Sequence, residues 1–239
     1  MRTVVLCGGR GTRLDALGKA VPKALVEIGG KPIIWHLINV YAAAGFRDFA
    51  LCTGYLGDLI ENYFESDGFS SDSLFDDVRV DLFETGQDTN TGGRIAAIKD
   101  SLAEEERFFV TYGDGLSDID VKALLDFHLS HGKKATLTSV RPNSTFGVLD
   151  ISEDGAVEQF REKPKLDVWI NGGFFVFERS VLEILEPDSV LEREPLEQLA
   201  AEGELMAYRH NGFWKCMDTF KDSLEFNELW EADAPWKRW

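Results

Sequence analysis

Cysteine is scarce in this chain, with three residues in 239, at positions 7, 52 and 216. Three widely separated cysteines build neither a disulfide framework nor a cysteine-rich zinc site, and an odd number suits a reducing compartment. Long hydrophobic runs are also missing, since none approaches the roughly 18 residues of a membrane-spanning helix. The few apolar residues before the first polar loop are far fewer than a secretion signal contains. We therefore expect a cytoplasmic protein that has no membrane partner.

Two common phosphate-binding motifs are absent as well. The chain contains no G-x-x-x-x-G-K-[ST] P-loop, and its Gly9-x-Gly11 pair is followed by Leu14 where the dinucleotide fingerprint requires a third glycine. The four histidines include no compelling general base, and two of them, His128 and His131, fall in one amphipathic helix. Any phosphate chemistry in this chain must therefore rest on other residues.

The chain does have a glycine- and arginine-rich turn directly after a short strand predicted at residues 3–6. The turn consists of Leu6, Cys7, Gly8, Gly9, Arg10, Gly11, Thr12, Arg13 and Leu14, and Pro22-Lys23 follows it. Glycines leave backbone N–H groups accessible, and the arginines add fixed positive charge at the same place. This combination predicts a polyphosphate site, although a glycine turn of this kind can also be a solvated turn without a ligand.

The distribution of charge favours an anion site in this segment. The whole chain is acidic, with 25 Lys and Arg against 42 Asp and Glu and a net charge of −17. The first 31 residues reverse the sign, with six basic against two acidic residues, a net of +4. The other 208 residues have 19 basic against 40 acidic residues, a net of −21. Positive charge confined to one loop suits the capture of a small anion and argues against a nucleic-acid partner.

The order of the predicted elements indicates an α/β fold in a single domain, residues 1–239. Up to about residue 145, short apolar strands alternate with helical segments, which is typical of a parallel sheet with helices on its faces. Beyond that point a hairpin is predicted at 146–161, followed by further strands and helices. We expect a Rossmann-like, mostly parallel mixed sheet flanked by helices. The later segments form a β-rich extension that covers one side of the cleft at the strand ends.

Three polar residues are predicted to cap helices, because their side chains can accept hydrogen bonds from the first free N–H groups of a helix. Thr91 precedes a helix predicted at 92–102, Asp118 precedes one at 121–131, and Thr219 precedes one that runs to about residue 232.

Two carboxylates are placed where they can meet a triphosphate. Asp114 lies between Gly113 and Gly115 at the end of a buried strand, and Asp218 lies between a short strand and a helix near the other end of the chain. Mg²⁺ commonly binds through one or two carboxylates, with phosphate and water supplying the remaining oxygens. The pair is a candidate magnesium site, while the alternatives are a turn residue for Asp114 and part of a helix cap for Asp218.

These motifs together resemble those of the sugar-nucleotide pyrophosphorylases, a family of sugar nucleotidyltransferases with a GT-A-like fold. The resemblance is carried by Leu6–Leu14 with Pro22-Lys23, Val26–Pro32, Thr91–Arg94, Tyr112–Gly115, Glu162–Pro164, Ile170–Phe175 and Trp214–Thr219. The Thr-Gly-Gly-Arg and Trp-Lys-Cys-Met-Asp-Thr segments are similar to the cytidylyl branch of the family. The chain departs from that branch at Cys216 and in the segment from about Ser66 to Glu84, which is shorter.

The resemblance implies transfer of a cytidylyl group from CTP to α-D-glucose 1-phosphate, with CDP-glucose and pyrophosphate as products. It implies Mg²⁺-dependent in-line displacement at the α-phosphorus, in CDP-deoxysugar or surface polysaccharide biosynthesis. A phosphate monoester is largely ionised at neutral pH, so this reaction requires no general base. The alternatives are a thymidylyl- or uridylyltransferase that acts on another sugar 1-phosphate, and a catalytically idle nucleotide-sugar-binding protein.

The same resemblance implies a role for each matching residue. Residues 1–145 would bind the nucleotide and residues 146–239 the sugar phosphate. Arg13 would hold the leaving β- and γ-phosphates, Lys23 the α-phosphate, and Asp114 with Asp218 the metal. Further nucleotide contacts would come from Leu6, Gly8, Gly9, Arg10, Gly11, Thr12, Thr89, Thr91, Gly93, Arg94 and Gly113, and sugar-phosphate contacts from Gly115, Glu162, Lys163, Asn171, Gly172 and Trp214.

Two of these segments also have simpler interpretations from the residues alone. Thr91 can be only a helix cap, and Glu162–Pro164 can be an ordinary charged turn. The tryptophan-rich end of the chain, with Trp230, Trp236 and Trp239, can be core, an oligomer contact or a lid. The family forms homo-oligomers, and aromatic residues are enriched at interfaces, which favours the oligomer contact.

Overall fold

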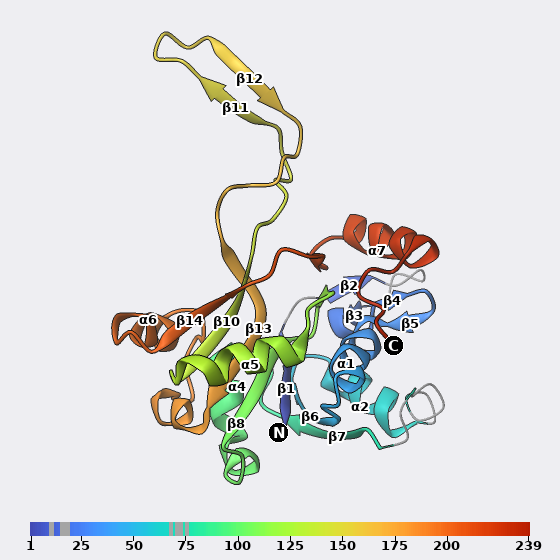
Figure 1. Cartoon of the computed structure of the whole chain (residues 1–239). Coiled ribbons are helices and arrows are strands. Elements are labelled where there is room, and N and C mark those ends of the chain that lie inside the picture. Colours follow the sequence, from blue (N-terminus) through green and yellow to red (C-terminus); the bar gives the residue numbers. More distant parts are fainter. Residues whose placement is uncertain (10–11, 15–19, 67–68, 70–73, 75–76) are drawn as a thin grey trace.

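A computed structural model describes residues 1–9, 20–66, 69, 74 and 77–239, and the backbone of residues 12–14 (Figure 1). Its centre is a seven-stranded sheet in the order β14-β10-β13-β8-β1-β6-β7. The strands of this sheet are β1 (Thr3–Leu6), β6 (Asp48–Thr53), β7 (Arg79–Glu84), β8 (Arg107–Tyr112), β10 (Ala135–Val140), β13 (Ile170–Glu178) and β14 (Leu205–Arg209).

The sheet is parallel except at one strand. β1 runs parallel to β6 and β8, β6 runs parallel to β7, and β10 runs parallel to β14. β13 pairs antiparallel with both β8 and β10, and its register with β10 shifts between Leu137 and Ser139. This is the mostly parallel mixed sheet expected from the order of elements. Its parallel strands end at one edge, which is where such sheets bind ligands.

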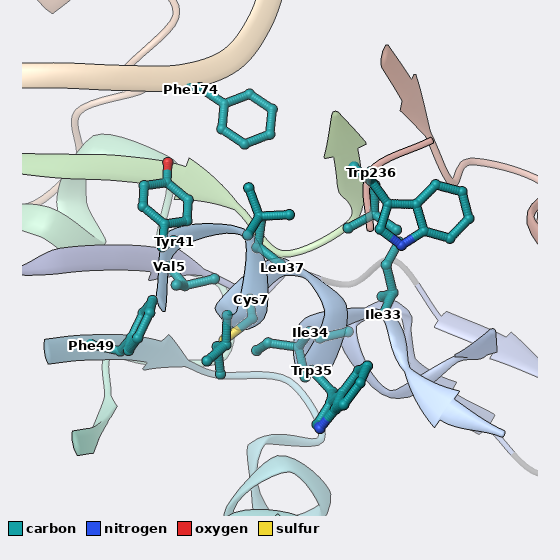
Figure 2. Packing of buried hydrophobic residues seen from close by; sticks show 14 of the residues in the cluster. Val5, Cys7, Ile33, Ile34, Trp35, Leu37, Tyr41, Phe49, Phe174 and Trp236 are labelled. Atoms are coloured by element: carbon teal, nitrogen blue, oxygen red, sulfur yellow. The ribbon is translucent and has the colours of Figure 1, made fainter. Parts of the chain in front are cut away.

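The two faces of the sheet bury separate hydrophobic clusters. On β1, Val5 belongs to one cluster, while Val4 and Leu6 belong to the other. The same alternation holds on β8, where Phe109 faces the first cluster and Phe108 the second. Successive side chains of a strand point to opposite faces, so a strand that is apolar at every position needs cover on both sides. Figure 2 shows part of the first cluster, in which helix residues such as Leu37 lie over the strands.

Helices supply that cover on each face. Residues of α1 (Ile33–Ala43), α2 (Gly57–Glu65), α5 (Val121–His131) and α7 (Phe220–Ala232) pack in the first cluster. Residues of α4 (Thr91–Ala97), η2 (Lys99–Leu102), η3 (Arg179–Ile184) and α6 (Glu194–Ala201) pack in the second. The remaining short elements are β2 (Thr12–Leu14), β3 (Ala20–Pro22), η1 (Lys23–Leu25), β4 (Glu27–Ile28), β5 (Lys31–Pro32), β9 (Gly115–Ser117) and β15 (Trp214–Cys216).

Only one of the three predicted helix caps is correct. Thr219 caps α7 in a reciprocal capping box with Asp222. For α5 the cap is Asp120, whose side chain accepts a hydrogen bond from the Ala123 N–H, and not Asp118. For α4 the N-cap position is Asn90. Thr91 is the first residue of that helix, and its hydroxyl donates a hydrogen bond to Glu192.

The predicted hairpin is present as β11 (Val148–Ile151) and β12 (Val157–Arg161), and it projects beyond the sheet as an arm (Figure 1). One face of the arm is polar and contains the Asp150–Arg161 ion pair at 2.9 Å. The other face is apolar, with side chains that are 45–63% exposed: Leu149, Ile151, Val157 and Phe160. The hairpin therefore extends away from the sheet, and its apolar face is open.

The tryptophan-rich end of the chain is part of the core. Trp236 is fully buried, and its ring lies 5.5 Å from that of Phe226 and 5.9 Å from that of His36. Trp230 and Trp239 are half-buried against the same cluster. Of the three roles considered for these residues, Trp236 therefore has the core role, while the oligomer contact stays a prediction for Trp230 and Trp239. Among the residues that the structure describes, no helix combines the length and the apolarity needed to span a membrane.

Candidate active site

A cavity of about 600 Å³ opens at the carboxyl ends of β1 and β8. This volume is within the range of small-molecule sites. Its walls come from the glycine turn, the start of η1, the segment 87–94, the turn after β8, the 190–192 loop and β15. The lining residues are Leu6, Cys7, Gly8, Gly9, Lys23, Ala24, Gln87, Asp88, Thr89, Asn90, Thr91, Arg94, Tyr112, Gly113, Asp114, Val190, Glu192 and Cys216.

Lys23 joins the two predicted metal ligands. Its Nζ donates to Asp114 Oδ2 at 3.1 Å and to Asp218 Oδ1 at 2.7 Å. Burial alone would lower the pKa of Lys23, but the hydrogen bonds and charges of Asp218 and Asp114 outweigh it and raise the pKa. The ammonium group is therefore charged at neutral pH. The Lys23 and Asp114 side chains are about one-fifth exposed and that of Asp218 is 65% exposed, so the cluster opens toward solvent on the Asp218 side.

Two strand and helix contacts set the positions of these carboxylates. β9 pairs antiparallel with β15, which places Cys216 opposite Gly115, and the Met217 N–H donates to the Asp114 carbonyl at 2.8 Å. The capping box at the start of α7 holds the next residues, because Asp222 accepts from the Asp218 N–H at 3.1 Å. Asp222 also accepts from Lys215 at 2.9 Å and from the Thr219 N–H. Burial would raise the pKa of Asp222, but these donors outweigh it and lower the pKa to about 2.

Cys216 adds a third potential metal ligand to Asp114 and Asp218. Its thiol lines the cavity beside Asp114 and is only partly buried. Burial, together with the negative charges of Asp114 and Asp218, raises the pKa of the thiol, so it is protonated at neutral pH. Asp114, Cys216 and Asp218 each present one ligand atom, and these atoms lie within 4.8 Å of one another.

Arg94 is buried at 3% exposure, and its guanidinium holds the wall of the cavity together. Nη2 donates to the Gly8 carbonyl at 2.8 Å, and Nη1 donates to the Thr53 and Gly86 carbonyls at 2.8 and 2.9 Å. These carbonyls follow or end β1, β6 and β7, so one side chain joins three parallel strands at their carboxyl ends. The glycine is required at position 8, since a Cβ there would lie 2.3 Å from Arg94 Nη1.

A second network joins the 91–94 helix turn to the opposite wall. Thr91 Oγ1 donates to Glu192 at 2.6 Å and accepts from the Leu191 N–H at 2.9 Å. Tyr112 donates its hydroxyl hydrogen to the same carboxylate, and Asn171 donates to the Tyr112 oxygen at 3.4 Å. Burial and the charge of Glu192 raise the pKa of Tyr112, so its hydroxyl is neutral. Glu192 thus connects the predicted nucleotide and sugar sides of the cavity.

The structure brings about half of the predicted site residues together at this cavity. Those that line it are Leu6, Gly8, Gly9, Lys23, Thr89, Thr91, Arg94, Gly113 and Asp114. Asp218 adjoins it through Lys23, and Asn171 adjoins it through Tyr112. Gly172 accepts a hydrogen bond from Trp214 Nε1 at 2.7 Å, while Gly115 pairs with Cys216. Arg10 and Gly11 lie outside the described residues, as do the side chains of Thr12 and Arg13.

Besides Gly115, Gly172 and Trp214, three further predicted residues are not among those that line the cavity. Gly93 packs against the neighbouring loop, where a Cβ would lie 2.2 Å from the Pro187 carbonyl oxygen. Glu162 and Lys163 lie at the base of the arm, with side chains 62% and 50% exposed and 3.7 Å apart. The sugar-phosphate role of Lys163 therefore remains a prediction from the resemblance.

Six polar residues that line the cavity were not predicted from the sequence: Gln87, Asp88, Asn90, Tyr112, Glu192 and Cys216. Glu192 and Cys216 were not predicted to contribute to the site, and Tyr112 was read only as part of the motif that contains Asp114. For Cys216 a signal existed, because it lies two residues before Asp218 in a segment already assigned to the metal site. For Glu192 there was none, since it lies in a loop between η3 and α6 that carries no motif.

The fold and the site define a nucleotidyltransferase. The chain belongs to that family: the sequence profile described as Nucleotidyl transferase matches residues 2–232. It is similar to the glucose-1-phosphate cytidylyltransferase of Salmonella typhi, with 45% identity and full coverage of both chains, and to the probable glucose-1-phosphate cytidylyltransferase of Bacillus subtilis, with 41% identity and full coverage of both. Among solved structures, HddC from Yersinia pseudotuberculosis has a TM-score of 0.72 at 22% identity, covering 96% of this chain and 99% of that one.

These findings confirm the family and the fold expected from the motifs. The likeness to HddC supports the fold alone, because so low an identity leaves the substrate open. Enzymes of this family typically use a divalent metal.

Proposed function

We propose that this enzyme transfers a cytidylyl group from CTP to α-D-glucose 1-phosphate and releases CDP-glucose and pyrophosphate. The observation that carries the proposal is the Lys23–Asp114–Asp218 cluster beside a glycine-lined cavity. The identity of 41–45% over the full length of relatives named for that reaction supports the choice of CTP and glucose 1-phosphate. A role in CDP-deoxysugar or surface polysaccharide biosynthesis follows from the product.

In this proposal the chain acts by positioning and charge. The backbone at Gly8 and Gly9 faces the triphosphate, with Arg94 holding the Gly8 carbonyl from behind. Lys23 is charged and hydrogen-bonded to Asp114 and Asp218. In the reaction its ammonium group turns toward the α-phosphate, where negative charge shifts during in-line displacement. Arg13 meets the leaving phosphates. On the far wall, Glu192 provides acceptors suited to sugar hydroxyls, and Asn171, which adjoins that wall through Tyr112, provides a donor.

We propose Mg²⁺ as the metal, held by Asp114 and Asp218. The donor set fits, because Mg²⁺ prefers oxygen ligands and keeps open positions for water and phosphate. When bound, the ion would neutralise charge on the triphosphate. Lys23 occupies the space between the two carboxylates with its own positive charge, so a metal ion and Lys23 compete there until a phosphate engages the lysine.

We also propose that the enzyme is a homo-oligomer that works in the cytoplasm. A two-stranded hairpin is marginally stable on its own, and the arm exposes the apolar pair Leu149–Phe160 on its open face. A second copy of the chain, pairing through the same face, would bury these side chains. The three free thiols, Cys7, Cys52 and Cys216, suit a reducing compartment.

Pyrophosphate release tests the reaction. We would assay CTP, UTP, dTTP, GTP and ATP, each against several sugar 1-phosphates, with Mg²⁺ and with EDTA. We expect turnover only with CTP, glucose 1-phosphate and metal. Asp218→Asn should lower kcat/KM by roughly 100-fold, because it removes one metal ligand, whereas the exposed Glu228→Gln on α7 should change little. Turnover with another nucleotide and sugar phosphate would overturn the proposed substrates. Turnover without Mg²⁺ would overturn the proposed metal.

A further inference from the structure

The carboxylates proposed for Mg²⁺ have a sulfur atom beside them. Among the described residues, Asp114, Cys216 and Asp218 form a group whose ligand atoms lie within 4.8 Å of one another. Their arrangement is set by the backbone, because β15 pairs with β9 and puts Cys216 opposite Gly115, next to Asp114. Two carboxylates and a thiol at this spacing can reach a single ion with small side-chain movements.

A second observation shows that this place attracts a cation. The Lys23 ammonium lies between Asp114 and Asp218, at 3.1 and 2.7 Å, and so stands where a metal ion held by both carboxylates would stand. Lys23, Asp114 and Cys216 all line the same cavity. The lysine side chain is long and flexible, so it can leave the carboxylates when an ion arrives.

The chemistry of the three ligands differs from that of an oxygen-only magnesium site. Mg²⁺ gains little from sulfur, whereas Zn²⁺, Cd²⁺ and Co²⁺ bind thiolate strongly. We propose that Cys216 is a third metal ligand, which makes the Asp114–Asp218 site a binding site for thiophilic divalent cations. The proposal rests on the two carboxylates being the metal ligands of the proposed reaction. On binding, a metal–sulfur bond forms and the thiol proton passes to solvent.

The other two cysteines provide an internal comparison. Cys7 also lines the cavity, but its thiol donates to the Cys52 carbonyl at 3.3 Å, on the sheet side of the cavity. Cys52 is fully buried, and its thiol lies 3.8 Å from the Arg94 carbonyl. Neither belongs to the group of ligand atoms within 4.8 Å. A thiophilic ion should therefore bind through Cys216 and leave Cys7 unaffected.

The test is Co²⁺ binding in the absence of substrates, followed by absorption spectroscopy. A cobalt–thiolate bond gives a strong charge-transfer band in the near ultraviolet that oxygen ligands do not produce. We expect one Co²⁺ per chain with this band, loss of the band in Cys216→Ser with a drop in Co²⁺ affinity of about 10-fold or more, and retention of the band in Cys7→Ser. Zn²⁺ should displace Co²⁺ at equal concentration, whereas Mg²⁺ should do so only in large excess.

Asp218→Asn separates this inference from the proposed function. If the shared site is right, this variant loses both Mg²⁺-dependent pyrophosphate release and tight Co²⁺ binding. An alternative outcome is a wild type that needs Mg²⁺ and Asp218 for turnover but shows no charge-transfer band and the same Co²⁺ affinity as Cys216→Ser. That result would overturn the role of Cys216 and leave the proposed function intact. A band that survives in Asp218→Asn at full affinity would place the thiophilic site elsewhere and overturn the inference as well.

Discussion

Arg94 is predicted to act as a clamp behind the nucleotide site, and its replacement tests this directly. The Thr-Gly-Gly-Arg motif assigns Arg94 to the nucleotide, but the guanidinium is buried and its hydrogen bonds go to the Gly8, Thr53 and Gly86 carbonyls and to the Thr85 hydroxyl. Arg94→Met keeps an unbranched side chain of similar length and removes every donor. We expect lower stability together with a higher KM for CTP.

The magnitude depends on which acceptors lose their last partner. The Gly8 carbonyl keeps a bond from the Tyr55 N–H at 3.2 Å, and the Thr53 carbonyl keeps one from the Thr85 N–H at 3.1 Å. Only the Gly86 carbonyl has no second donor among those described. An orphaned buried acceptor costs about 1–3 kcal/mol; Gly86 is only partly buried, so its carbonyl falls at the low end of that range, and the two weakened carbonyls add less. The variant no longer buries a guanidinium, whose pKa burial lowers, and this relief offsets part of the loss, so we expect a net loss of about 1–3 kcal/mol.

Arg94→Lys should fall between the wild type and Arg94→Met. The acceptors of Arg94 are divided between two guanidinium nitrogens, and a single ammonium nitrogen does not reach both sets. We expect a loss of about 1–2 kcal/mol, which corresponds to roughly one unsatisfied carbonyl.

Urea unfolding followed by circular dichroism, together with CTP saturation kinetics, measures both effects. Arg79→Met is the matched control, because Arg79 is 66% exposed and its ion pair with Asp81 lies at the surface; its stability should change by less than about 0.5 kcal/mol. Equal losses in the two variants would refute the clamp. So would an Arg94→Met enzyme of wild-type stability that no longer binds CTP, since that result would make Arg94 a direct contact.

Three further predictions concern Gly8, Asp222 and the apolar face of the arm. Gly8→Ala should unfold at clearly lower urea than the wild type because its Cβ would lie 2.3 Å from the buried guanidinium, whereas Gly9→Ala, with nothing within 4 Å, should not. Asp222 has a pKa of about 2 in the folded protein against an ordinary 3.8, so its ionised form adds about 2 kcal/mol of stability above pH 4, and this stability disappears as the pH falls toward 2. Between pH 6 and pH 3 the unfolding free energy of the wild type should therefore fall by about 1 kcal/mol more than that of Asp222→Asn. Equal falls in the two proteins would contradict the lowered pKa. Replacing Leu149 and Phe160 together with serine should lower the mass measured by light scattering without unfolding the sheet, and an unchanged mass would exclude the arm as the oligomer contact.

Much of the fold was predictable because it depends on short-range pattern. Apolar strands such as residues 107–112 alternate with helices at a spacing that only a mostly parallel sheet accommodates, and the structure has that sheet. The α7 cap at Thr219 was predictable because the capping residue and its partner are three residues apart. The caps of α4 and α5 were not, because several adjacent polar residues compete for each cap and tertiary contacts decide among them. Thr91 is drawn to Glu192, and Asp118 forms an ion pair with Arg238 at 2.9 Å.

The site was predictable only in part. Motifs located Lys23, Asp114 and Asp218, because these residue types at a glycine turn and at strand ends are typical of phosphate and metal chemistry. The contacts of Arg94 were not predictable, because the sequence of a glycine motif does not distinguish an arginine that binds a phosphate from one that binds three backbone carbonyls. Glu192 lies in a loop without a motif and enters the site through long-range packing alone.

The sequence by itself determined the order of strands and helices, the glycine turn with its local positive charge, and the residue types available for phosphate and metal binding. Those features depend on neighbours along the chain. Only the tertiary structure decided that Lys23 meets Asp218 across 195 residues, that Trp236 is core, and that Cys216 lies beside the carboxylates. These outcomes depend on how β9, β15 and α7 pack at one edge of the sheet, because long-range contacts arise when separate apolar surfaces are buried together.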